Sequence, residues 1–251
     1  MKNPIKALWQ ANRTAINGWC NLSGSMIAEA MGRAGWDSVT IDLQHGVIDY
    51  MEAVTMIQAI SLTPATPLVR APWNDPAIIM KLLDAGAMGI ICPMVNNAAE
   101  AAAFVSNCRY PPQGRRSFGP IRAGMVHDNY WSQANDAILT IAMVETAEAM
   151  ENLDGIMATP GLDAVYIGPS DLGLSLVGKP IPEPDDPTVL AAVAKVLEKA
   201  RQHKIVAGFH NMTPEHAKKM SDQGFRFVTI GGDMRFLAQT AAAVVKAYGP
   251  R

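Results

Sequence analysis

Two carboxylates follow apolar runs that have the character of buried strands. Glu145 comes directly after ILTIAMV, and Asp171 comes shortly after AVYIGP. Two carboxylates completed by waters are the usual protein share of a hard divalent site such as Mg²⁺ or Mn²⁺, with positions left for substrate oxygens. Co²⁺ or Zn²⁺ could also bind. The pair predicts a metal centre, and the alternative is a structural ion network with Arg70.

An arginine and a histidine stand at equivalent points of two other runs. Arg70 ends PLVR, and its planar guanidinium suits an enolate or carboxylate oxygen. The alternative for Arg70 is a strut that holds the following loop. His45 lies in IDLQHG, and histidine titrates near neutral pH, which favours proton transfer. We prefer a general-base role for His45 to a structural one because two candidate metal ligands and Arg70 stand at equivalent points of other runs.

The remaining polar residues at the ends of apolar runs complete the set of candidate site residues. Trp19 and Asp42 each stand at the end of an apolar run, Trp19 is a candidate substrate-binding residue, and His210 in GFHN is expected to be a supporting or structural residue. In the turn Gly168-Pro169-Ser170-Asp171, the last two residues could aim backbone N–H groups at a carboxylate, since Pro169 has none. Asp84 stands near the end of a predicted helix, where the macrodipole disfavours a negative charge, so a compensating partner is expected.

These side chains must be brought together by the elements that carry them. Short apolar runs alternate with stretches of helical period, which indicates βα units around a parallel sheet. Eight units close a (β/α)8 TIM barrel, a single domain over residues 1–251, and the polar residues then meet at the carboxyl ends of its strands. The predicted strands are 16–20, 38–42, 67–70, 89–92, 139–145, 164–168, 205–209 and 227–231.

Helix starts are legible in the sequence. Some have the spacing of a capping box, and others place a capping side chain before a proline. The first kind is Asp49 with Glu52 and Asn97 with Glu100, and the second is Asp75-Pro76, Asp186-Pro187 and Thr213-Pro214. Gly86 predicts a helix stop.

Two segments are predicted to be long loops, 110–136 and 172–186. Loops at a barrel mouth often determine substrate specificity, and the first contains three candidates for selecting a substrate: Arg116, Phe118 and Arg122. The second could cover the barrel mouth or be a solvated loop.

Composition favours small-molecule chemistry. The net charge is −2, and no Lys/Arg run suggests a nucleic-acid or membrane partner. The first residues lack a signal-like apolar stretch, so a cytoplasmic protein is expected. Three cysteines without a C-x-x-C pair suit a reducing compartment and are expected to be buried, although reactive thiols are an alternative: Cys20, Cys92 and Cys108.

Missing motifs narrow the chemistry. The sequence has no P-loop, no G-x-G-x-x-G after a first strand and no G-x-S-x-G elbow, so ATP, dinucleotide and serine-hydrolase chemistry lose support. A Schiff-base aldolase would need a lysine near the strand ends. Lys204 precedes a strand and Lys179 lies in a Gly/Pro-rich loop, which favours a metal-enolate route.

Six motifs in order give the chain a family resemblance. IDLQHG, PLVRAPWNDP, LLDAG, YPPQGRRSFG, ETAEAMENLD and IGPSDL resemble the HpcH/HpaI family of pyruvate-dependent class II aldolases over nearly the whole chain. The resemblance implies a homo-oligomer, a hexamer, and the same barrel.

The resemblance also implies residue roles. Glu145 and Asp171 would hold the metal, His45 would transfer the proton, and Arg70 would stabilise the transition state. Asp84 would support the histidine, either within one chain or across a subunit boundary, with Asp42 close to the same network. The backbone of Ser170 and Asp171 would bind the pyruvate carboxylate.

Two positions depart from the best-known members. Met143 stands where they have a glutamine, two residues before the metal glutamate, and Gln44 replaces the acidic residue before the histidine. The first change removes a polar substrate contact, so their substrate does not transfer to this chain.

Together these features predict a metal-dependent aldolase. It would reversibly cleave a 4-hydroxy-2-oxo acid to pyruvate, or a close 2-oxo acid, and an aldehyde through a metal-stabilised enolate. A metal-dependent lyase or decarboxylase acting on a related oxo acid is the first alternative. A non-catalytic metabolite-binding barrel is a remote one.

Overall fold

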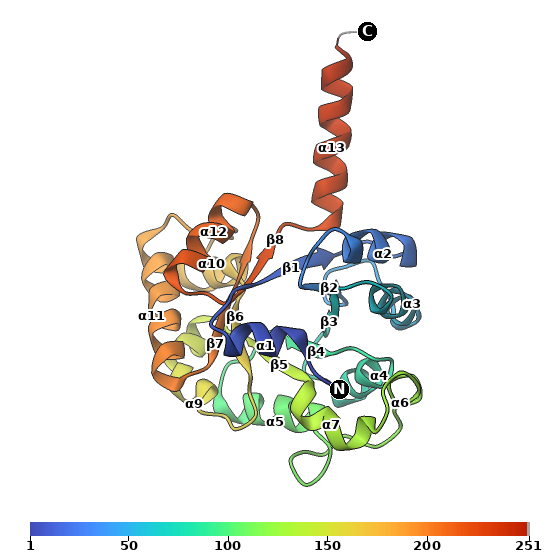
Figure 1. Ribbon diagram of the computed structural model, residues 1–251. Helices are drawn as coiled ribbons and strands as arrows, with labels where there is room; N and C mark the ends of the chain where they lie inside the picture. Colours follow the sequence, from blue (N-terminus) through green and yellow to red (C-terminus); the bar gives the residue numbers. More distant parts are fainter. Residues whose placement is uncertain (250–251) are drawn as a thin grey trace.

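The computed structural model describes residues 1–249 and contains a closed barrel of eight parallel strands in chain order (Figure 1). Each strand pairs with the next, and β8 pairs with β1 through Ala15, Ile16 and Asn17. The predicted (β/α)8 barrel is therefore confirmed. The strands are β1 Ala15–Cys20, β2 Ser38–Asp42, β3 Thr66–Arg70, β4 Gly89–Cys92, β5 Leu139–Met143, β6 Ala164–Ile167, β7 Val206–Asn211 and β8 Phe227–Ile230.

Helices follow the strands and surround the barrel (Figure 1). Within the described chain they are α1 Pro4–Gln10, α2 Ser25–Arg33, α3 Tyr50–Ser61, α4 Pro76–Asp84, α5 Ala98–Cys108, α6 Ala123–Val126, α7 Tyr130–Ala137, α8 Ala147–Glu151, α9 Leu153–Met157, α10 Pro169–Val177, α11 Pro187–His203, α12 Pro214–Gln223 and α13 Asp233–Tyr248.

Two apolar layers hold the barrel. Strand side chains alternate between the interior and the helix-covered outside, so both faces of each strand are buried. Interior residues such as Leu68 and Tyr166 form one cluster, and Val39 and Ile90 belong to the outer cluster under the helices. At the amino end of the barrel, Trp9 of α1 meets Phe227 edge to face at 5.9 Å, so α1 covers that end.

The predicted helix starts are confirmed with one difference. Asp49 and Glu52 form a reciprocal capping box, and Asp75, Asp186 and Thr213 each cap a helix that begins with proline. Asn97 accepts a hydrogen bond from the Glu100 N–H, but the Glu100 carboxylate accepts from the Asn96 N–H instead of closing the box. Gly86 follows α4 with φ of +106°.

The two predicted loops are partly helical. Segment 110–136 contains α6 and most of α7. The start of segment 172–186 belongs to α10, which begins at Pro169, and Gly178 ends it in the left-handed conformation, φ +74°. The loop prediction was wrong there. Proline at the first helical position and glycine just past the last one are signals of a helix. Pro169 and Gly178 are such signals for α10, and the loop prediction did not use them.

The last helix projects from the barrel (Figure 1). Asp233 is the buried residue of α13, whereas Leu237, Val244, Val245 and Tyr248 are exposed on it. Among residues 1–249, no helix is long and apolar enough to cross a membrane.

All three cysteines are buried and unpaired, as predicted. Burial raises the thiol pKa in each, in Cys108 to about 12. Neutral thiols at physiological pH argue against the reactive alternative.

Candidate active site

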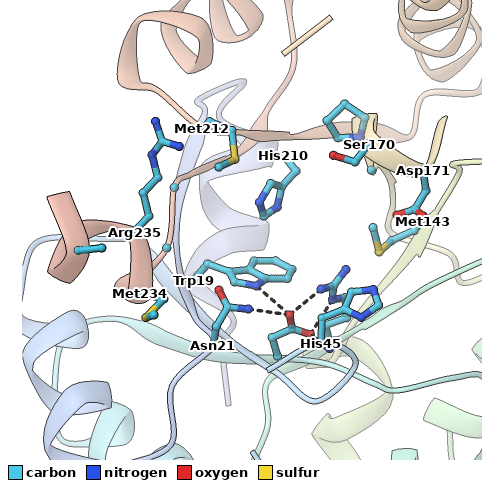
Figure 2. A pocket seen from close by; sticks show the side chains of 17 residues that line it. Trp19, Asn21, His45, Met143, Ser170, Asp171, His210, Met212, Met234 and Arg235 are labelled. Carbon is cyan, nitrogen blue, oxygen red and sulfur yellow. Dashed lines mark hydrogen bonds and ion pairs between the residues drawn. The ribbon is translucent and has the colours of Figure 1, made fainter. Parts of the chain in front are cut away.

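A cavity of about 430 Å³ opens at the carboxyl ends of the strands (Figure 2). The residues that line it come from the ends of seven strands or the loops after them, from the first turn of α10 and from the first two turns of α13. They are Trp19, Asn21, Asp42, His45, Arg70, Met143, Gly168, Pro169, Ser170, Asp171, His210, Met212, Gly231, Gly232, Met234, Arg235 and Ala238.

Asp42 is the anchor of one side of the cavity. Its carboxylate is fully buried and accepts from Arg70 Nε at 2.8 Å and Nη2 at 2.6 Å, a bidentate pair. Trp19 Nε1 and Asn21 Nδ2 donate to the same carboxylate at 3.2 and 3.0 Å. Burial alone would raise the pKa of Asp42, but the hydrogen bonds and charge of Arg70 outweigh it and lower the pKa.

Arg70 is fixed from two directions. Besides the Asp42 pair, its guanidinium lies 4.9 Å from the centre of the Trp19 ring, a cation–π contact. A guanidinium held in this way keeps one orientation at the cavity. Arg70 therefore presents a positive charge whose direction is set before any ligand arrives.

His45 lies on the loop after β2 and also lines the cavity. Its backbone N–H donates to Asp42 at 3.3 Å, as does that of Gln44 at 3.0 Å, so Asp42 shapes this loop as well. The His45 side chain is exposed, and within residues 1–249 its ring hydrogen-bonds no other side chain. A single chain places the imidazole at the cavity without fixing its orientation.

Glu145 is a buried carboxylate that lies against Gly168, on the other side of the cavity. It is 2 % exposed, and Oε1 accepts from the Met94 N–H at 2.9 Å, whereas Oε2 is buried without a hydrogen-bond partner. Burial raises its pKa to about 7, and the nearby Asp171 charge adds to the shift. A buried carboxylate oxygen with no donor is costly unless a cation binds it.

Asp171 and the turn before it complete this side. Gly168 precedes α10, Pro169 begins it, and Asp171 stands in its first turn (Figure 2). The first N–H groups of a helix have no partner inside the helix, so those of Ser170 and Asp171 are available to an anion. A Cβ on Gly168 would lie 2.1 Å from Glu145 Oε2, so a side chain at this position would displace that carboxylate.

These residues fit a divalent metal. The unpartnered Glu145 oxygen and the exposed Asp171 carboxylate are hard oxygen donors on adjacent strand ends. Within residues 1–249, no group of three or more His, Cys, Asp or Glu side chains could hold a metal. The protein's share of the site would be two carboxylates, with water or substrate oxygens as the other ligands.

Four expected site residues lie away from the cavity within one chain. Asp84 ends α4, which runs back toward the amino end of the barrel, and Arg116 Nη2 donates to it at 2.7 Å. Arg116 is the compensating partner that the sequence required. Arg122 donates to the Ala85 carbonyl at 2.8 Å, and Phe118 is 67 % exposed beside Tyr110. Any contact of these residues with a cavity needs a second chain.

Other cavity residues were not singled out from sequence. Asn21 and Met212 are each the first residue after a strand, so a search that included the residue after each strand end would have found them. Met234 and Arg235 belong to the first turn of α13, where no sequence signal pointed to the cavity. Met143, in contrast, was singled out from sequence, and it lines the cavity wall as an apolar side chain.

Comparisons with known proteins agree with this geometry. A family model described as HpcH/HpaI aldolase/citrate lyase matches residues 16–240. A hydroxypyruvate/pyruvate aldolase from Rhizorhabdus wittichii is 41% identical over 97% of both chains. A 4-hydroxy-2-oxo-heptane-1,7-dioate aldolase from Salmonella heidelberg is 37% identical over 99% of this chain and 95% of that one.

The fold has close structural relatives. The crystal structure of an HpcH/HpaI aldolase/citrate lyase family protein from Burkholderia cenocepacia superimposes with a TM-score of 0.91. It is 28% identical and covers 98% of both chains.

Proposed function

Because this chain belongs to the HpcH/HpaI aldolase/citrate lyase family, we propose that it is a metal-dependent aldolase acting on 4-hydroxy-2-oxo acids. It releases pyruvate or a close 2-oxo acid such as hydroxypyruvate, together with an aldehyde. The observation that carries the proposal is the buried, unpartnered Oε2 of Glu145, which lies against Gly168 of the cavity wall and near Asp171, in the cavity that Arg70 also lines. The names of the aldolase relatives support the reaction class.

The carboxylates and the α10 turn would bind the metal ion and the substrate. Glu145 and Asp171 would hold the metal, Mg²⁺ or Mn²⁺ by the hardness of their oxygens, with Co²⁺ or Zn²⁺ as alternatives. The bound ion supplies positive charge that stabilises the negative charge developing on the 2-oxo acid. The N–H groups of Ser170 and Asp171 bind the substrate carboxylate at the start of α10, and Gly168 and Pro169 leave room for it.

Arg70 and His45 act on the reacting groups. The guanidinium, fixed by Asp42 and Trp19, stabilises negative charge on oxygen as the carbon–carbon bond breaks. His45 removes the proton of the C4 hydroxyl in cleavage and returns it in synthesis. Asp84 of a second chain is the residue proposed to orient His45, because Asp84 of the same chain lies at the far end of α4.

We also propose a homo-oligomer, a hexamer by family resemblance. The apolar residues of α13 are exposed in the single chain, and a second copy would cover them. The aldehyde-selecting role of Arg116, Phe118 and Arg122 likewise depends on a neighbouring chain. The neutral, unpaired thiols support the proposed cytoplasmic location.

The first test is pyruvate release from racemic 4-hydroxy-2-oxo acids, coupled to lactate dehydrogenase. We expect activity that EDTA abolishes and Mn²⁺ or Mg²⁺ restores. Product analysis separates the aldolase from a lyase or decarboxylase, because only the aldolase yields an aldehyde in equal amount. Ligand binding without turnover would favour the non-catalytic barrel.

The second test separates metal binding from proton transfer. His45→Ala should lower kcat by about 10²- to 10⁴-fold, the usual contribution of a general base, while Mn²⁺ affinity stays near the wild-type value. Glu145→Gln should lose Mn²⁺ affinity itself. Equal loss of both properties in His45→Ala would contradict this division of roles.

A further inference from the structure

His210 of β7 projects into the cavity from the side opposite His45 (Figure 2). Its ring meets Trp19 edge to face at 4.9 Å and Tyr166 at 6.2 Å, both near 88°. Two fixed aromatic neighbours hold the imidazole in one orientation. The reaction steps proposed above leave this half-buried histidine without a role.

A chain of buried hydrogen bonds fixes which ring nitrogen carries the proton. The Tyr166 hydroxyl donates to Thr229 Oγ1 at 2.6 Å, and burial raises the Tyr166 pKa, so this donor stays protonated. Asn17 Nδ2 donates to the same Thr229 oxygen at 2.9 Å. Since the one Tyr166 proton is committed to Thr229, its oxygen accepts at the 3.0 Å contact with His210 Nδ1. We infer from this direction that Nδ1 carries the hydrogen.

The other nitrogen then has a free lone pair. Within residues 1–249, His210 Nε2 has no protein partner, and the ring faces the cavity. Burial lowers the pKa of His210 to about 4, Arg70 lowers it further, and Asp42 opposes the shift. The imidazole is neutral near pH 7, so Nε2 accepts a hydrogen bond and cannot donate one.

We propose that His210 is a specificity-determining residue whose Nε2 accepts a hydrogen bond from an alcohol group of the substrate. A lone pair cannot bind a carboxylate or a keto oxygen. Among 2-oxo acids and aldehydes, alcohols are the groups that donate. The alcohol belongs either to the donor, as at C3 of hydroxypyruvate, or to the aldehyde, as in glycolaldehyde. This inference rests on the proposed aldolase function for its substrates.

The test compares matched substrates that differ by one hydroxyl. One pair is hydroxypyruvate and pyruvate with propanal, and the other is glycolaldehyde and acetaldehyde with pyruvate. His210→Phe keeps an aromatic ring against Trp19 but removes the acceptor. We expect the ratio of kcat/KM for hydroxylated over deoxy substrate to fall about fivefold in one pair, which identifies the source of the alcohol.

Two further variants separate recognition from packing. Tyr166→Phe removes the acceptor of the Nδ1 hydrogen and keeps the ring, so we expect the same ratio to fall in the same direction by a smaller factor. His203→Phe makes the identical change on α11, outside the cavity, and should leave both ratios unchanged. ¹⁵N NMR should show a pyrrole-like Nδ1 and a pyridine-like Nε2 for the signal lost in His210→Phe.

The outcomes distinguish this inference from the proposed function. Product formation with both ratios unchanged in His210→Phe would overturn the role of His210 and leave the aldolase in place. A pyrrole-like Nε2 would overturn it as well. If the wild type formed no product, the aldolase would fail. The dissociation constants of hydroxypyruvate and pyruvate, compared between wild type and His210→Phe, would still test the acceptor.

Discussion

Asp42 shows how one residue can organise a site without touching the chemistry. Its oxygens accept from Arg70, Trp19 and Asn21 and from the backbone that carries His45, so its bonding capacity is used within the protein. Glu145 is the opposite case, because one of its oxygens has no partner. Asp42 lines the cavity and positions a cation of the protein, whereas Glu145, next to Gly168 of the cavity wall, is available to an external cation.

Arg70→Lys tests the geometric role of the guanidinium. An ammonium keeps the charge but cannot make the two parallel bonds to Asp42, so its direction toward the cavity is lost. We expect kcat/KM to fall by about 10- to 100-fold, with the melting temperature changed much less. Steady-state kinetics with wild-type values would contradict the proposed role.

Gly168→Ala tests the contact between the α10 turn and the metal site. The new Cβ would lie 2.1 Å from Glu145 Oε2 and must displace that carboxylate. We expect Mn²⁺ affinity, measured by calorimetry, to fall by at least about tenfold, as for other changes that misplace a ligand. Gly124→Ala is the control, because its Cβ meets nothing closer than 3.5 Å. Unchanged Mn²⁺ binding in Gly168→Ala would mean that Glu145 does not hold the ion.

At the scale of elements, the strands were predictable and part of the cavity wall was not. Apolar runs revealed all eight strands, and strand ends contain Trp19, Asp42 and Arg70. Met234 and Arg235 escaped prediction because the first turn of α13, which follows the Gly231-Gly232 pair after β8, brings them to the cavity. The Asp84 pair escaped because it joins α4 to a long loop, and no local pattern shows which arginine of that loop reaches the helix.

The Asp84–Arg116 pair should stabilise the fold. The Arg116 side chain is fully buried, stacks 4.4 Å from the Tyr110 ring centre and donates to both Asp84 and Tyr130. Arg116→Ala leaves the Asp84 carboxylate without its partner and leaves a void where the arginine side chain was. We therefore expect a loss of about 3 kcal/mol in the free energy of unfolding, measured with urea. Arg33→Ala breaks an exposed pair with Glu29 and should cost less than about 1 kcal/mol. Similar costs for both would contradict this account.

The candidate active site and the helix that closes the barrel lie at opposite ends of the molecule. α1 covers the amino end, the cavity opens at the carboxyl end, and α13 leaves the barrel altogether (Figure 1). The start of α13 is nevertheless fixed to the barrel, because Asp233 accepts from the N–H groups of Asn21 and Leu22 at 2.8 and 3.1 Å. Phe236 also stacks on Trp36.

Val245→Glu tests whether a second copy covers α13. A charge in the exposed apolar stretch should weaken association, so light scattering after gel filtration should report a smaller mass than for the wild type. Thr240→Glu changes an exposed polar position of the same helix and should weaken association less. A monomeric wild type would contradict the proposed oligomer.

The two ends of α13 could link ligand binding to self-association. Met234, Arg235 and Ala238 form part of the cavity wall, while the rest of the helix offers the surface for a second copy. If a neighbour orders this helix, ligand affinity and self-association are thermodynamically linked, and each must strengthen the other by the same factor. Dilution of the enzyme would then raise its apparent KM, and saturating substrate would hold the assembly together.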